Sequence, residues 1–121
     1  MNVDEEDKPR AYTPEEVREL LLSHFRMMVG YWKRAKIDDE LRAFLAKHGQ
    51  DELDWRLEGL VHSILVTFDG GASGLPAFNI IPAPHPSDRA FHENEGENWY
   101  ESVVINECQL HDAWHAEERS K

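Results

Sequence analysis

The sequence is poor in cysteine, in positive charge and in long apolar runs. Its 121 residues include one cysteine, Cys108, so no disulfide can form within the chain. Thirteen Lys and Arg stand against 24 Asp and Glu, and the resulting formal charge of -11 would repel nucleic acid and anionic lipid surfaces. The longest mostly apolar run, residues 60–68, is interrupted by His62 and is too short to span a bilayer. We therefore expect a protein that binds neither nucleic acid nor membrane.

The N-terminal residues are charged rather than apolar, which is unlike a secretory signal and, with the single cysteine, favours the cytoplasm. Residues 1–12 are expected to form a flexible acidic tail, and residues 13–121 a single globular domain. Hydrophobic residues make up 40% of the chain, with four Trp, three Tyr and five Phe, which is enough to build one core at this length.

Three amphipathic patterns predict a helical N-terminal unit. The first helix is predicted over 14–35, after a capping box formed by Thr13 and Glu16. The second is predicted over 38–48 and the third over 52–68. The residues expected to face inward are, on the second helix, Leu41, Phe44 and Leu45, and on the third, Leu53, Leu57, Leu60, Val61, Ile64, Leu65 and Phe68. Gly59 in the third helix indicates a close approach by another helix.

The C-terminal half is rich in loop-forming residues. Glycines between 69 and 74 end the third helix, and four prolines between 76 and 86 exclude a long helix there. Two antiparallel strands are predicted over 77–81 and 102–106, a short helix over 87–94 with Ser87 as its cap, and a last helix over about 107–119. The predicted fold is therefore mainly α (α+β): three packed N-terminal helices, a two-stranded sheet and a C-terminal helix.

One histidine pair has the spacing of a metal site. His111 and His115 are four residues apart, so both imidazoles would lie on one face of the last helix. The intervening Asp112 stands where the zinc hydrolase motif HExxH has its general base, although it is one methylene shorter than Glu.

A third metal ligand would have to come from elsewhere in the chain. The candidates are His85, Asp88 and His92, and Glu97 is a second candidate for the base. The cofactor would then be a divalent metal ion. Structural or surface histidines are the alternative explanation of the same spacing, and Cys108 is expected to be a small buried residue.

Four segments of the C-terminal half give the chain a distinctive pattern: Phe68–Gly71 (FDGG), Leu75–Phe78 (LPAF), Pro82–Asp88 (PAPHPSD) and Gly96–Tyr100 (GENWY). In these segments the chain resembles a family of small uncharacterised bacterial proteins. The resemblance covers roughly residues 55–115 and implies a bacterial or phage origin, but no activity.

Three functions are compatible with this sequence. The leading hypothesis is a non-catalytic protein-interaction or regulatory module, whose partner is another protein or further copies of itself. The first alternative is a metal-dependent hydrolase that uses the His/Asp cluster. The second is an acidic mimic of a polyanion, which would bind basic clefts on other proteins.

Overall fold

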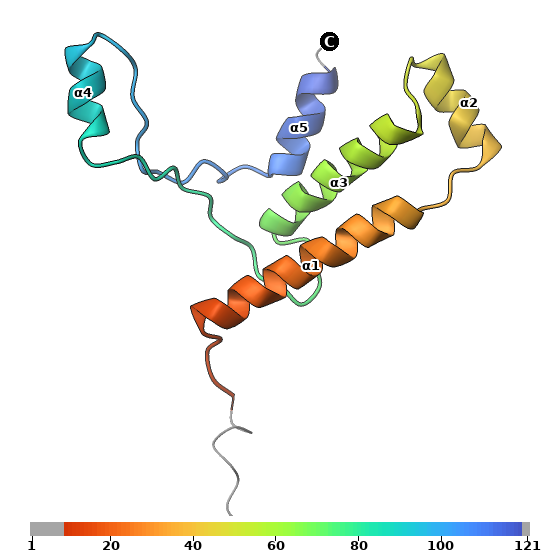
Figure 1. Cartoon of the computed structure of the whole chain (residues 1–121), viewed down its shortest axis with the longest axis horizontal. Coiled ribbons are helices and arrows are strands. Elements are labelled where there is room, and N and C mark those ends of the chain that lie inside the picture. Colours follow the sequence, from red (N-terminus) through yellow and green to blue (C-terminus); the bar gives the residue numbers. More distant parts are fainter. Residues whose placement is uncertain (1–8, 120–121) are drawn as a thin grey trace, which may run out of the picture.

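The computed structural model describes residues 9–119, with side chains to residue 116. The chain is mainly helical, as the sequence predicted, and its helices are joined by turns and extended segments (Figure 1). The helices are α1 (Pro14–Arg34), α2 (Asp39–Lys47), α3 (Glu52–Phe68), α4 (Asp88–Asn94) and α5 (Leu110–Arg119).

The helix starts in the N-terminal half lie where local capping chemistry places them. Thr13 accepts a hydrogen bond from the backbone N–H of Glu16, whose carboxylate accepts the N–H of Thr13 in return. Asp51 and Asp54 form the same reciprocal box before α3, and Asp38 caps α2. These short-range bonds explain why the starts of α1, α2 and α3 are predictable from sequence.

Helix α3 is the centre of the helical unit, because it packs against α1, α2 and α5. The close approach expected at Gly59 is confirmed, since the Trp32 indole of α1 lies directly against it. The Trp32 Nε1–H donates to the Ser63 Oγ at 2.9 Å, and the ring packs edge-on against Trp55. A side chain at position 59 would displace this indole, so glycine permits the contact between α1 and α3.

The hydrophobic core of the described residues is small. Among the residues that the structure describes, the buried apolar side chains are Met28, Ile37 and Leu45, and they are accompanied by one fully buried hydroxyl, that of Thr67. Phe44, which the sequence placed inward, is exposed. A chain with 40% hydrophobic residues thus leaves much of its apolar surface uncovered.

The prediction of a two-stranded sheet over 77–81 and 102–106 was wrong, because the described residues contain no strand. The two segments do lie side by side, and the Ile105 N–H donates to the Ile80 carbonyl at 2.9 Å. The Asn106 side chain makes two more hydrogen bonds between the segments: its Oδ1 accepts from the Ile80 N–H, and its Nδ2 donates to the Phe78 carbonyl. Prolines 82 and 84 have no backbone N–H to donate, so the hydrogen-bonded pairing of the two segments does not extend into a β-ladder.

Helix α4 stands away from the other helices, at the end of two extended segments (Figure 1). We call the segment before it, residues 79–87, the outgoing leg, and the segment after it, residues 95–106, the returning leg. We call residues 79–106 the arm. Ser87 makes no capping hydrogen bond to α4, contrary to expectation; its hydroxyl instead lies 2.7 Å from His85 Nδ1.

The last helix begins at Leu110, three residues later than predicted. Cys108, which was expected to be buried, is exposed in the turn before it. Among the described residues, no helix combines the length and apolarity that crossing a membrane requires.

Candidate functional site

A cluster of three histidines and one aspartate joins the end of α3 to α5. Asp69 follows α3, and its carboxylate accepts the backbone N–H groups of Leu110 at 2.8 Å and His111 at 2.9 Å. It therefore caps α5 from a position 41 residues earlier in the chain. The same carboxylate lies 2.6 Å from His111 Nδ1, which fixes the orientation of that imidazole.

The second half of the cluster is a histidine pair. His62 Nδ1 on α3 lies 2.9 Å from His115 Nε2 on α5, and the His62 ring also packs edge-on against His111. His111 and His115 thus share one face of α5, as their spacing predicted. Their partners are His62 and Asp69, neither of which the sequence analysis assigned to this site.

The predicted upstream ligands lie elsewhere. His85, Asp88 and His92 belong to the arm, and α4 does not contact α5. Glu97 is also in the arm, 3.5 Å from His92, whereas Asp112 is exposed beside His111. Within residues 9–119, no three His, Cys, Asp or Glu side chains are grouped so that they could hold a metal ion.

The electrostatics of the cluster favour a neutral His62 and a charged Asp69. Burial lowers the pKa of His62, and the neighbouring His115 and His111 lower it further. Burial of Asp69 opposes its ionisation, but the hydrogen bonds from His111 and Leu110 outweigh that effect and lower its pKa. The Asp69 carboxylate, with 3% of its side chain exposed, therefore stays ionised as the cap of α5.

The lowered pKa of His62 predicts a pH-dependent stability. The unfolded chain binds a proton at this site more tightly than the folded chain, so stability is complete above the ordinary value of 6.5 and falls below it. Urea midpoints at a fixed protein concentration are expected to drop between pH 7.5 and pH 5.5. The drop should be smaller in His62→Gln, whereas the exposed His85→Gln should behave like the wild type. An unchanged drop in His62→Gln would contradict this assignment.

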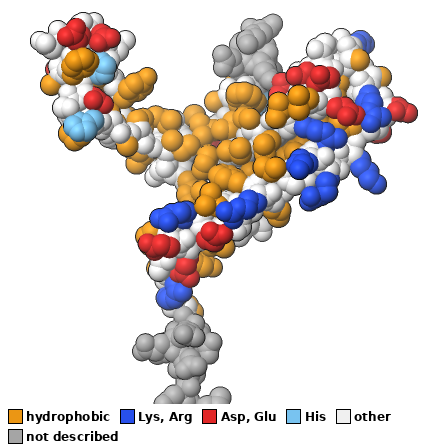
Figure 2. Space-filling model, viewed as in Figure 1, with side chains coloured by type: hydrophobic (Ala, Val, Ile, Leu, Met, Phe, Trp, Pro, Cys, Tyr) orange, Lys and Arg blue, Asp and Glu red, His pale blue; other side chains and the backbone are white. Residues whose placement is uncertain are grey.

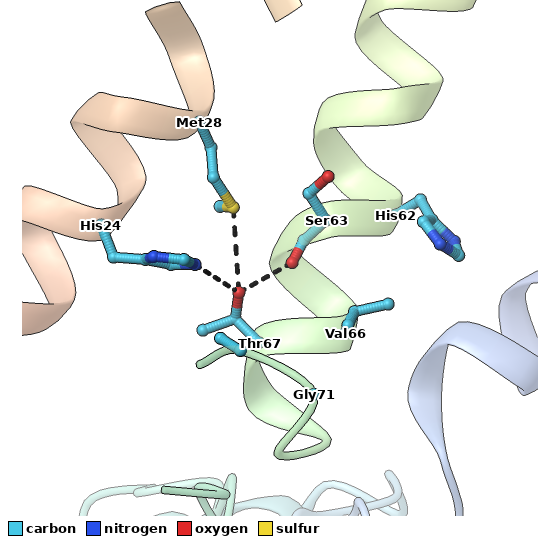
Figure 3. Close-up of a pocket in the computed structure, with 8 residues that line it drawn as sticks. His24, Met28, His62, Ser63, Val66, Thr67 and Gly71 are labelled. Carbon is cyan, nitrogen blue, oxygen red and sulfur yellow. Dashed lines mark hydrogen bonds between the residues drawn. The ribbon is translucent and has the colours of Figure 1, made fainter. Parts of the chain in front are cut away.

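A pocket of about 300 Å³ opens beside the cluster, between α1 and α3 (Figure 3). At its floor the buried Thr67 hydroxyl lies 2.8 Å from the Ser63 carbonyl, 3.2 Å from His24 Nε2 and 3.8 Å from Met28 Sδ. Because the Ser63 carbonyl is the nearest acceptor, Thr67 donates its proton there and accepts from His24. The hydroxyl thus ties α1 to α3 and is not an accessible nucleophile.

A second feature is an apolar surface on one side of the α1–α3 pair. On α3, Gly59, Ser63 and Thr67 face α1, and the leucine stripe lies about a quarter turn away. The Phe25 and Phe68 rings meet edge-on across the pair, with their centres 6.0 Å apart. The apolar stripes of α1 and α3 therefore lie on the same side. We call this surface the apolar face; it comprises Leu22, Phe25 and Val29 of α1 and Leu53, Leu57, Leu60 and Ile64 of α3.

The apolar face is uncovered. Leu53 and Leu57 are 62% and 54% exposed, and Leu22 and Val29 are 40% and 44% exposed. Figure 2 shows apolar side chains gathered over α1 and α3 and continuing toward the arm. The stripe that the sequence placed in the core is therefore only partly buried, because α1 packs against the side of α3 that carries Gly59.

Comparison with known proteins assigns no activity to either feature: no protein-family model, curated protein or solved structure matches the chain.

Proposed function

We propose that the protein is a non-catalytic interaction module that assembles through its apolar face, and that the partner on this face is a second copy of the chain. The observation that carries the proposal is the leucine stripe of α3. Leu53 and Leu57 lie on the most apolar side of the central helix and yet are more than half exposed. Contiguous apolar surface of this kind on a folded chain is typical of a binding site.

The amount of exposed surface supports a large interface. The chain exposes 9956 Å², whereas a compact monomer of its mass would expose about 6,700 Å². The ten residues outside the described range can account for at most about 1,700 Å² of the excess. The remainder, roughly 1,500 Å² on one chain, exceeds the ~800 Å² that each partner buries in a standard interface.

Charge also favours a second copy. Arg18, Arg26 and Lys33 alternate with Leu22 and Val29 at intervals of four, four, three and four, so a basic row borders the apolar face, although Arg26 already pairs with Glu19 of α1 at 3.1 Å. Figure 2 shows blue Lys and Arg side chains along the α1 edge of the patch. The arm carries five Asp and Glu against one Arg, so each copy offers an acidic surface that complements this row.

The histidine cluster supports catalysis less well than the apolar face supports assembly. The cluster has no three-ligand metal group within the described residues, and the two hydroxyls beside it are already engaged: that of Thr67 is buried, and that of Ser63 accepts the Trp32 indole N–H. His62, His111 and Asp69 instead connect α3 to α5, which is a structural task. The metal-dependent hydrolase is therefore not the function we propose.

A fluorescent dye that binds exposed apolar surface tests the proposal. At tens of micromolar protein we expect little emission from 8-anilinonaphthalene-1-sulfonate, because a second copy covers the apolar face. Emission per chain should rise on dilution as the copies separate, while far-UV circular dichroism stays helical. Strong emission that is independent of concentration would show that no second copy covers the face, and would overturn the proposal.

A further inference from the structure

Within the described residues, the helix at the end of the arm packs on no other helix of its own chain. Helix α4 contacts none of the other helices, and the arm exposes large apolar side chains along its whole length. These are Ile81, Phe91, Tyr100, Val103 and Ile105, each more than half exposed. A helix of seven residues is not stable in water alone, so α4 needs a surface to pack on.

The arm is nevertheless an organised element. At its tip the Arg89 guanidinium stacks 4.9 Å from the Trp99 ring centre and lies 3.6 Å from the Glu101 carboxylate. The Trp99 Nε1–H donates to the same carboxylate at 2.9 Å. These contacts hold α4 against the segment that follows it, so this part of the arm presents a defined surface.

The base of the arm directs it away from its own helices. The Phe78 N–H donates to the Phe68 carbonyl at the end of α3. Beyond that point, the Asn106 side chain joins the two ends of the arm by its hydrogen bonds to Phe78 and Ile80. Prolines 82, 84 and 86 keep the outgoing leg extended. Figure 1 shows the resulting projection of α4 away from α1 and α3.

We propose that the arm of each copy packs on the apolar face of the other copy, so that two chains exchange arms. Phe91 and Tyr100 would cover the leucine stripe, and the glutamates of the arm would lie against the basic row of α1. Both halves of this contact are unpartnered apolar surfaces bordered by opposite charge. The inference rests on the proposed self-assembly and specifies which surfaces meet.

Mixing two defective variants tests the exchange. Phe91→Asp damages the arm and leaves the face intact, whereas Leu57→Asp damages the face and leaves the arm intact. By light scattering, each variant alone is expected to dissociate at least about 30-fold more readily than the wild type. An equal mixture should recover dimers, because one intact arm can pack on one intact face. Tyr12→Asp, an exposed position outside both surfaces, is the control and should remain dimeric.

The outcomes distinguish a failure of arm exchange from a failure of self-assembly. If Phe91→Asp stays dimeric, the faces pair directly and arm exchange is wrong, while self-assembly stands. If the mixture recovers no dimer although both variants are folded by circular dichroism, the arm does not cross between copies, and arm exchange is again wrong. A wild type that is monomeric throughout would overturn both this inference and the proposed self-assembly.

Discussion

Leu57→Asp is expected to convert the assembly into single chains, whereas Met27→Asp is expected to leave it intact. Both residues are exposed apolar positions on packed helices. Leu57 belongs to the exposed leucine stripe of the apolar face, and in the assembly a carboxylate there would be buried against apolar side chains without a partner. Loss of a buried anchor residue costs at least about 2 kcal/mol of association free energy, so the dissociation constant of the dimer should rise by about 30-fold or more.

Met27 is a matched control, because it projects from the side of α1 opposite to Leu22. Sedimentation velocity over a concentration series, with far-UV circular dichroism to verify folding, measures both variants. Equal dissociation of the two variants would show that the apolar face has no special role. Dissociation of Met27→Asp alone would place the interface on the other side of α1.

Gly59→Ala is expected to cause a larger loss of folding stability than other single-methyl additions. An added Cβ would lie 2.4 Å from two carbons of the Trp32 ring, closer than two carbons can approach. Moving the indole would disturb its hydrogen bond to Ser63 and its packing on Trp55. We expect overpacking to cost about 1–3 kcal/mol, offset by up to ~1 kcal/mol from the higher helix propensity of alanine.

The control is the equivalent change on α1. In Gly30→Ala the new methyl meets only the flexible end of the Arg34 side chain, which can move aside. Gly30→Ala should therefore be neutral or stabilising by up to about 1 kcal/mol. Urea unfolding of both variants at one protein concentration makes the comparison. A Gly59→Ala protein as stable as Gly30→Ala would show that the indole does not lie against α3 as described.

The parts of the fold that could be predicted are those fixed by neighbouring residues. The capping groups Thr13, Asp38 and Asp51 act within four residues, so the helix starts follow from sequence. The start of α5 does not, because its cap, Asp69, comes from the end of α3. The sequence FDGG identified this position only as a helix stop. A capping carboxylate that acts across 41 residues leaves no local signal.

The candidate sites could be predicted only in part, for the same reason. The spacing of His111 and His115 correctly placed two imidazoles on one face of α5. It could not indicate that His62 faces them, since α3 and α5 are brought together only by tertiary packing. The periodicity of α3 likewise identified its apolar side but not what covers it. Gly59 and Trp32 direct α1 to a different side and leave Leu57 exposed.

Sedimentation equilibrium of the wild-type chain tests the central claim most directly. At micromolar concentration and moderate salt, we expect a particle of twice the 14.1 kDa chain mass that dissociates on dilution. A particle of single-chain mass at every concentration, with the helical content intact, would contradict the claim that a second copy covers the apolar face.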